Sequence, residues 1–402
     1  MIFANVLDWV ITEGSVKRVT DSLGNILWEK QGGHDYSQDY FFVEDASGSA
    51  NTLTIKKSSS NSNTLTVYKS TDQVNWSSMG STNTTGITAT IPANGKLYLK
   101  CTTTAWGNVY NTSSFLTNTI KCSGNHNVGG NIMSLIKGAN FQNTTLDSTN
   151  KYAFQSIFTQ SDNLISAGNL IMPSYIPEKG CFKMFDSCTS LTTAPNLPAT
   201  TIETEAYNYL FYRCSALTTA PLAINATELP TRACSQMFSG CTNLVTPPSI
   251  QATVLSGNQC CYGMFYNCTS LTTAPVLPAT TLAYSCYEGM FEGCTSLTTA
   301  PALPATTLAQ SCYAFMFSGC TALTTAPALP ATTLANYCYH YMFYACRSLN
   351  NITTYATTIQ SNSITNWLLN VAATGDFYNL GGATYTSGAS GIPAGWTEHN
   401  TL

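Results

Sequence analysis

The sequence predicts a mainly β protein with short helices, organised as a solenoid of about eight 26–27-residue repeats that follows a β-sandwich and an N-terminal hairpin. Two observations predict this fold class. The phrase Phe-x-x-Cys-x-x-Leu recurs from residue 185 at a fixed spacing, and a fixed period of about 20–50 residues is typical of solenoids. Between about residues 40 and 122, apolar and polar residues alternate, which is typical of antiparallel strands. With 44% hydrophobic residues, the 402-residue chain can bury a substantial core.

The N-terminal part is predicted to form two units, an anchoring hairpin and hinge over residues 1–35 and a β-sandwich over residues 36–129. Strand-like residues on either side of Asp21–Asn25 indicate the hairpin, which is too small to be stable without a partner. We therefore expect its apolar residues to anchor the chain on another protein. These candidate anchoring residues are Val16, Val19, Ile26 and Trp28.

The repeats are predicted over residues 158–349. An upstream copy, from Phe158 to Leu164, has Ser161 in place of Cys. The segments 130–157 and 350–402 are predicted to cap the two ends, because an uncapped repeat exposes its core. The core phenylalanines of the seven complete copies are Phe185, Phe211, Phe238, Phe265, Phe291, Phe317 and Phe343.

Each part of the repeat has a predicted conformation. Ser-Leu-Thr-Thr-Ala-Pro alternates apolar and polar residues and is predicted to be a strand that the proline ends. Leu-Pro-Ala-Thr-Thr-Leu is predicted to turn the chain. Ala-x-x-Cys-Tyr-x-x-Met-Phe has small and apolar residues at helical spacing, which predicts one or two helical turns. Coils stacked in register at about 4.7–4.9 Å would form ladders of Phe, Leu and Cys.

This pattern resembles the leucine-rich repeats of BspA-like bacterial surface antigens, whose units carry a Phe-x-x-Cys-x-x-Leu phrase before a short strand. The resemblance covers about residues 158–349 and implies a leucine-rich-repeat-type solenoid. Leucine-rich repeats serve mainly as binding surfaces, so the resemblance also implies a binding function. The units of this chain are longer and carry less charge than those of the family.

The sequence contains 16 cysteines, most of them in the repeats. Neighbouring copies would lie within the Cα separation of about 4.4–6.8 Å that a disulfide accepts, so pairing remains an alternative. Buried free cysteine behaves as a small apolar residue, and we expect structural free thiols. We expect no metal site and no cofactor, because Cys188, Cys214 and Cys241 show no C-x-x-C pairing and no neighbouring His.

The low charge content excludes several functions. Asp, Glu, Lys and Arg make up 9% of the residues, the net charge is −4 and no basic cluster occurs, so we expect no nucleic-acid partner. No apolar stretch reaches the roughly 18 residues of a membrane-spanning helix, so we expect no membrane insertion. We also predict no enzyme and no catalytic residues. The four histidines are dispersed, and the acidic pairs Glu203 with Glu205 and Glu288 with Glu292 are interpreted as outward solubilising charges.

The candidate ligand-binding surface lies in the last repeats. From Cys294 to Cys346 the sequence contains no Asp, Glu, Lys or Arg, yet aromatic residues are frequent at positions expected to face outward. Exposed aromatic rings suit stacking on sugars or an uncharged protein partner. The alternative is that these rings only shield the edge of the core. The candidate residues are Tyr313, Phe315, Tyr337, Tyr339, Tyr341 and Tyr344.

The whole chain also resembles fibre and adhesion proteins on virions of phages that infect gut bacteria of the Bacteroides group. In those proteins such repeats recur, together with a Gly-Asn-Ile-Met-Ser-Leu phrase and a Gly-Ile-Pro-x-Gly-Trp ending, which this chain has at residues 130–135 and 391–396. The resemblance implies a virion protein, made in the host cytoplasm and released by lysis, and the opening residues show no basic region of a signal peptide. It implies an N-terminus docked on capsid or tail proteins and a solenoid that binds a host cell-surface glycan or protein.

Two other functions remain as alternatives. The first is a bacterial cell-surface adhesin with the same repeats, and the second is a virion-associated glycan depolymerase that would need a pair of carboxylates. The sequence leaves open whether attachment is at head or tail, whether the sandwich or the solenoid binds the ligand, and whether the chain forms a homotrimer.

Overall fold

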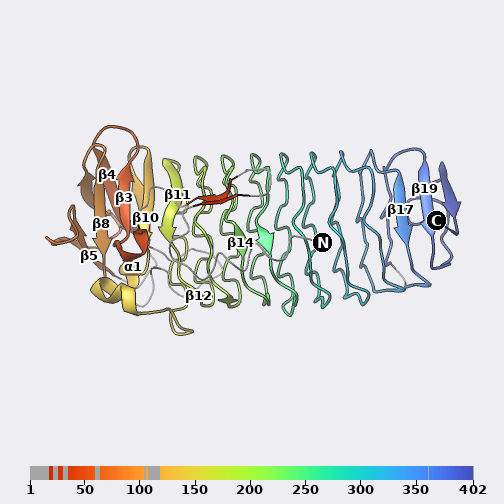
Figure 1. Ribbon diagram of the computed structural model, residues 1–402, viewed down its shortest axis with the longest axis horizontal. Coiled ribbons are helices and arrows are strands. Elements are labelled where there is room, and N and C mark those ends of the chain that lie inside the picture. The colour runs from red at the N-terminus through yellow and green to blue at the C-terminus, as the bar shows by residue number, and fades with distance from the viewer. Residues whose placement is uncertain are drawn as a thin grey trace.

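The computed structural model describes residues 18–20, 26–29, 35–58, 64–103, 106, 118–360 and 362–401, and at 18–20 and 26–29 it describes the backbone alone. The molecule is an elongated rod with a β-domain at one end (Figure 1). Stacked coils follow along the long axis, and the C-terminus lies at the opposite end.

The N-terminal hairpin is present as a pair of antiparallel strands, β1 (Arg18–Thr20) and β2 (Ile26–Glu29). Three of the predicted anchoring residues, Val19, Ile26 and Trp28, lie on these strands. Val16, the fourth, lies outside the described residues. The backbone therefore agrees with the predicted hairpin, and its anchoring role remains a prediction.

The β-domain contains two sheets, as the sequence predicts. Its strands are β3 (Phe42–Asp45), β4 (Asn51–Lys57), β5 (Thr66–Ser70), β6 (Ser77–Ser81), β7 (Ile87–Ile91), β8 (Lys96–Lys100), β9 (Asn118–Cys122), β10 (His126–Asn131) and β11 (Leu164–Ile171). One sheet has the order β11-β10-β3-β8-β5-β6, and the other has the order β7-β4-β9. In β4 and β7, buried residues alternate with more exposed ones. Side chains from both sheets, such as Ile55 and Val67, belong to one core.

The sandwich continues directly into the solenoid. Strand β10 pairs in parallel with β11, which lies in the first repeat. Between these strands lie α1 (Ser134–Lys137) and the 3-10 helix η3 (Gly138–Asn143), and a second short 3-10 helix, η2 (Tyr36–Gln38), precedes β3. The Ser134 hydroxyl donates to the Leu99 carbonyl at 3.0 Å and accepts from the Phe41 N–H at 2.9 Å. The Gly-Asn-Ile-Met-Ser-Leu phrase is therefore part of this junction.

The helical turns predicted inside the repeat do not form, and the only α-helix among the described residues is α1. The stretch is instead a run of overlapping turns. Every second N–H donates to the carbonyl three residues earlier, as from Met184 to Cys181 at 3.1 Å. The intervening N–H groups donate to the next coil, as from Cys181 to Ala206 at 3.0 Å. An α-helix is about 10 Å across and would hold the coils too far apart for these bonds.

The predicted strand is also shorter than expected. In Ser-Leu-Thr-Thr-Ala-Pro the coils share single parallel bridges, such as Thr193 with Thr219 and Thr273 with Thr299. Prolines lack the N–H that a longer ladder would need. Two-residue parallel strands form further along the coil, where the sequence predicts a turn. They are β12 (Tyr175–Ile176), β13 (Thr201–Ile202), β14 (Ala223–Ile224), β15 (Ser249–Ile250), β16 (Thr333–Leu334) and β18 (Thr358–Ile359).

The C-terminal segment completes the stack with a parallel sheet. Its order is β17 (Asn351–Thr354), β19 (Gly375–Asn379) and β20 (Trp396–His399). The Trp367 indole N–H donates to the Gly391 carbonyl at 3.0 Å, and the Trp396 indole N–H donates to the Ala372 carbonyl at 2.8 Å. The Gly-Ile-Pro-Ala-Gly-Trp ending thus ties the last coils together.

A column of phenylalanine rings runs through the core. Successive rings of the repeats are stacked with centroids 5.2–5.7 Å apart. The column begins in the β-domain, because the Phe41 ring lies 5.9 Å from that of Phe158. The predicted Phe ladder is confirmed, and it joins the sandwich and the solenoid in one core.

The repeat cysteines hydrogen-bond neighbouring coils. Each thiol of the phrase donates to the carbonyl of the core Phe in the preceding coil, as from Cys268 to Phe238 at 3.1 Å. The same hydrogen bond forms in each of the other copies of the phrase, from the copy that contains Cys188 to the copy that contains Cys346, at 2.9–3.1 Å. All 16 cysteines are buried and free. These thiols therefore link coils through weak hydrogen bonds that satisfy buried carbonyls.

We predict that the thiols are unreactive in the folded protein. Burial raises the pKa of Cys188, Cys294 and Cys346 to about 12, so little thiolate is present at neutral pH. Mass spectrometry after iodoacetamide treatment should find the native protein unmodified. After denaturation without reductant it should find all 16 cysteines alkylated. Stoichiometric bridges between adjacent coils would contradict this prediction.

We predict that Phe343→Ala destabilises the fold by about 3–5 kcal/mol, the usual cost of removing a buried aromatic ring. Phe343 is fully buried and stacks on Phe317 at 5.6 Å. Tyr344→Ala is the control, because this neighbouring ring is partly exposed. Urea unfolding measures the free energy of unfolding of both variants. An equal loss in the two would contradict a larger contribution from the buried Phe column.

Candidate functional site

The run of turns gives each coil an outward side with a period of four residues. In the coil of Phe343, Cys338 and Tyr339 are buried, the next two residues are partly exposed, Met342 and Phe343 are buried, and the next two are again partly exposed. In this coil the outward slots lie three and two residues before the core Phe and one and two residues after it, and Tyr337 lies one four-residue period earlier. In four other coils the slot three residues before the core Phe holds a buried side chain, namely Phe182, Asn208, Ser235 and Ala314. We call the surface formed by these slots the turn face.

Two of the six predicted binding residues do not lie on the turn face. Tyr313 and Tyr339 are each 1% exposed and stack on one another inside the core at 6.2 Å. Their stack continues to Tyr287 on one side and to Trp367 on the other. The prediction that these two residues lie on the surface is wrong, because it assumed helical spacing. In the run of turns two buried residues alternate with two outward ones, and the residue four positions before the core Phe is one of the buried ones.

The other four predicted residues lie together and are partly exposed. The Phe315 and Tyr341 rings are stacked at 5.1 Å, and Tyr344 meets Tyr341 edge to face at 5.5 Å. His340, which the sequence analysis did not select, lies 4.5 Å from the Tyr341 ring and 5.4 Å from that of Tyr337. We call these five residues the aromatic patch.

The aromatic patch carries no carboxylate, ammonium or guanidinium group. Burial lowers the pKa of His340, which is therefore neutral at pH 7. The Tyr341 hydroxyl accepts a hydrogen bond from the Asn366 side-chain amide at 2.7 Å, which holds this ring in place. The patch is thus a neutral group of rings suited to stacking.

A groove of about 350 Å³ lies beside the aromatic patch. It occurs where two successive coils have glycine, Gly263 and Gly289, two residues before the core Phe. The backbone at this slot has positive φ in every complete copy, including φ 57° at Phe315, so positive φ alone does not require glycine here. The two glycines instead leave open the space that a side chain fills in the neighbouring coils.

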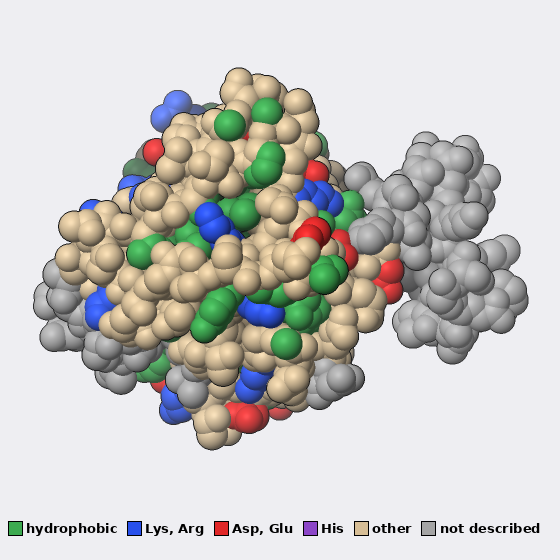
Figure 2. All heavy atoms as spheres, turned by 90° about the vertical axis from the view of Figure 1, so that its left-hand side faces the viewer, with side chains coloured by type: hydrophobic (Ala, Val, Ile, Leu, Met, Phe, Trp, Pro, Cys, Tyr) green, Lys and Arg blue, Asp and Glu red, His purple; other side chains and the backbone are tan. Residues whose placement is uncertain are grey.

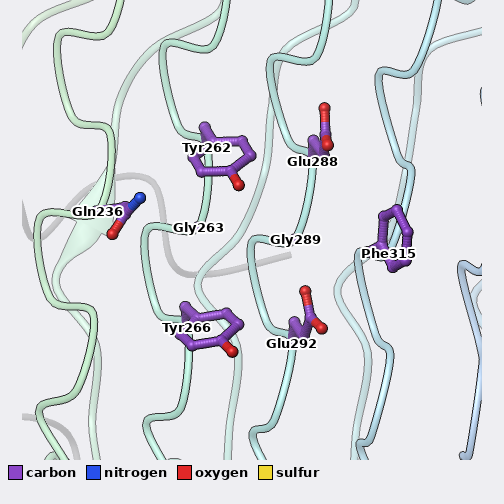
Figure 3. Close-up of a pocket in the computed structure, with 8 residues that line it drawn as sticks. All are labelled: Gln236, Tyr262, Gly263, Tyr266, Glu288, Gly289, Glu292 and Phe315. Carbon is purple, nitrogen blue, oxygen red and sulfur yellow. The ribbon is translucent and has the colours of Figure 1, made fainter.

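Rings and carboxylates surround this space. Figure 3 shows Tyr262 and Tyr266 on one coil and Glu288 and Glu292 on the next, with the glycines between the members of each pair. Phe315 lies beyond the glutamates. Because Phe315 also belongs to the aromatic patch, the groove and the patch form one continuous surface.

The two glutamates lie on the outward side of the coil, as the sequence predicts, but both are partly buried rather than fully exposed. Burial raises the pKa of Glu288 above its ordinary value. Burial also raises the pKa of Glu292 to about 6, and the charge of Glu288 adds to this rise. The sequence contains a signal for this site: Tyr and Glu occupy matching slots of two successive copies, and both copies have glycine between them.

The other acidic pair has partners. The Glu203 carboxylate accepts the Tyr175 hydroxyl and, at 2.9 Å, the Glu178 N–H. Glu205 forms an ion pair with Lys179 at 3.7 Å. Within the described ranges, no group of three or more His, Cys, Asp or Glu side chains could hold a metal ion. The groove itself offers aromatic rings for stacking and two carboxylates.

Charge on the turn face changes along the rod. In the first coils, Lys183 lies over the Tyr209 ring and Arg213 over the Tyr212 ring, each at 4.9 Å. Figure 2, viewed from the β-domain end, shows a surface of mostly uncharged atoms with separate charged side chains. The turn face therefore carries charges of both signs near the sandwich, where Lys183 pairs with Asp186 at 3.9 Å, and is acidic at the groove and neutral at the aromatic patch.

We predict that Glu292→Gln stabilises the protein at pH 8 and not at pH 4. The folded-state pKa of Glu292, about 6, lies above its ordinary value, so the folded protein favours the protonated carboxyl. The wild type therefore loses stability as the pH rises toward about 6, and this stability stays lost at higher pH. Glutamine carries no charge to desolvate and removes this loss. Thermal unfolding at both pH values measures the effect. An equal midpoint for the two proteins at pH 8 would contradict a desolvated carboxylate.

Within the described part of the chain, no helix has the length and apolar composition needed to cross a membrane.

The comparisons with known proteins identify the repeats. No curated protein and no solved structure matches the chain. The family model of the BspA type leucine-rich repeat region matches residues 133–272, 170–298 and 260–373. Together these matches cover more than half of the chain, and they include the coils that carry the Phe column. The chain therefore belongs to the BspA-type leucine-rich repeat family.

Proposed function

We propose that this protein is a non-enzymatic adhesion protein of a phage virion, whose N-terminus docks on the particle and whose solenoid binds a glycan on the host surface. BspA-type repeats suggest a surface adhesin or binding protein. The observation that carries the binding proposal is the neutral aromatic patch, continuous with a groove, on one face of an elongated rod.

The chemistry of the patch favours a sugar. Sugar rings present C–H faces that stack on aromatic rings, and Tyr337, Tyr341 and Tyr344 add hydroxyl groups for hydrogen bonds. Such contacts need no counter-charge and are weakly screened by salt. A rod that carries this surface far from its N-terminal domain is suited to reach a cell surface.

The virion part of the proposal rests on the resemblance to phage fibre and adhesion proteins and on the hairpin β1–β2, which has too few strands to be stable alone. A bacterial cell-surface adhesin would have the same repeats and the same turn face. The location of the native protein separates the two: recovery in purified phage particles supports the virion proposal, and recovery in a bacterial envelope fraction contradicts it.

A glycan depolymerase stays the second candidate because of one observation, the partly buried pair Glu288 and Glu292 beside aromatic rings. Glycoside hydrolysis uses two carboxyl groups, one of them with a raised pKa. Our proposal expects no reducing sugar to be released from host capsule by the purified protein. If the wild-type protein releases reducing sugar and the Glu292→Gln variant does not, the protein is a depolymerase and the non-enzymatic proposal is wrong.

We predict that the double variant Tyr341→Ala with Tyr344→Ala binds host cells at least about ten-fold more weakly, because it removes two stacking rings. Binding by the wild type should persist at high salt. The matched control is Tyr209→Ala with Tyr212→Ala, which removes rings from the same two slots of an earlier coil. Circular dichroism checks that both variants are folded. Equal binding by the two variants would contradict the patch as the binding site.

We predict that deletion of residues 1–30 leaves the sandwich and solenoid folded but prevents incorporation into phage particles. The described residues of the sandwich and solenoid share one core, and we expect that core to fold without the hairpin. Particle incorporation is measured by immunoblot of purified virions from a complemented phage. A truncated chain that still assembles would place the anchor elsewhere.

A further inference from the structure

The charges of the groove lack opposite charges. Between Arg232 and Arg347 the sequence contains two charged residues only, Glu288 and Glu292. Both lie in the groove, on one coil. Among the described residues, neither is part of an ion pair. The only charges of this long neutral stretch of sequence are therefore two carboxylates placed together in a hollow of the turn face.

This arrangement is unfavourable without a ligand. Burial disfavours the ionised form of both carboxylates and raises the pKa of each, and the charge of Glu288 adds to the rise at Glu292. A positive charge in the groove would remove this cost. The rings of Tyr262, Tyr266 and Phe315 line the same space, and aromatic faces also attract cations.

We infer that the groove binds an amino sugar with a free, protonated amino group, the ammonium between Glu288 and Glu292 and the sugar ring against the aromatic walls. This inference rests on the proposed glycan binding by the turn face and names the chemical class of the ligand. The space of about 350 Å³ suits one or two sugar units.

The lining favours an organic ammonium over a metal ion. Calcium takes about six to eight oxygen ligands, most of them from several carboxylates and carbonyls. The groove offers two carboxylates and three aromatic rings, and rings are ligands for an organic cation rather than for calcium. A sugar also uses the neighbouring aromatic patch, which a bare ion would not need.

Isothermal titration calorimetry of the full chain tests the inference with two probes. These are the tetramer of glucosamine and the tetramer of N-acetylglucosamine, at about pH 7, where Glu292 is ionised and much of the free amine is protonated. We expect the glucosamine tetramer to bind at least about ten-fold more tightly, because acetylation removes the positive charge.

Three variants locate the site. Glu288→Gln and Glu292→Gln should each weaken glucosamine binding at least about ten-fold and leave N-acetylglucosamine binding unchanged. Gly289→Tyr should block both probes without a change of charge. This slot holds Tyr341 in another coil at a similar positive φ, and an added Cβ meets only the Glu292 carboxylate, at 3.3 Å. Glu228→Gln, which alters an exposed carboxylate on another side of the coil, is the control.

Several outcomes would overturn the inference. Equal affinity for the two tetramers, full binding by the Gln variants, or calcium binding that the Gln variants lose would each do so. If host cells bind the protein through Tyr341 and Tyr344 but neither tetramer binds the groove, adhesion stands and the amino-sugar inference is wrong. If the glucosamine tetramer binds but host cells do not, the groove assignment stands and the adhesion proposal is wrong.

Discussion

The short separation between successive coils is the constraint on which the rest of the structure depends. Phe rings stack at 5.2–5.7 Å through the repeats, and backbone N–H groups of one coil donate to the next at hydrogen-bonding distance. A helix in the coil would widen one side of the stack, so the chain forms consecutive turns there instead. Parallel bridges and two-residue strands pair backbone groups of neighbouring coils, and the thiols add a second hydrogen bond to core Phe carbonyls that already accept one from a backbone N–H.

The consecutive turns also determine which side chains reach the surface. Because two inward residues alternate with two outward ones, side chains only one or two positions apart in the sequence can lie in the core or on the surface. Tyr339 is buried and His340 and Tyr341 are partly exposed, although the three are adjacent and all aromatic. Functional variation can therefore be confined to the turn face while the Phe column and the thiol bonds stay the same from coil to coil.

Stacking in register turns short sequence differences into surface features of greater length. A glycine in one coil would leave a small gap, whereas Gly263 and Gly289 in adjacent coils open one groove. Tyr262 and Tyr266 then face Glu288 and Glu292 across about one coil spacing (Figure 3). The aromatic patch arises in the same way, from Phe315 in one coil and Tyr341 in the next. A ligand that spans several coils can therefore meet different chemistry at each.

The sequence by itself determined the architecture, because the period of Phe-x-x-Cys-x-x-Leu requires identical coils and each coil must bury its Phe and Leu. It also indicated the region of the aromatic patch, since Phe315, Tyr337, Tyr341 and Tyr344 stand out in a charge-free stretch. Only the tertiary structure decided that Tyr313 and Tyr339 are core residues and that Glu288 and Glu292 line a groove. The physical reason is that exposure depends on the turn geometry, which hydrogen bonds between coils select, and a single repeat contains none of those bonds.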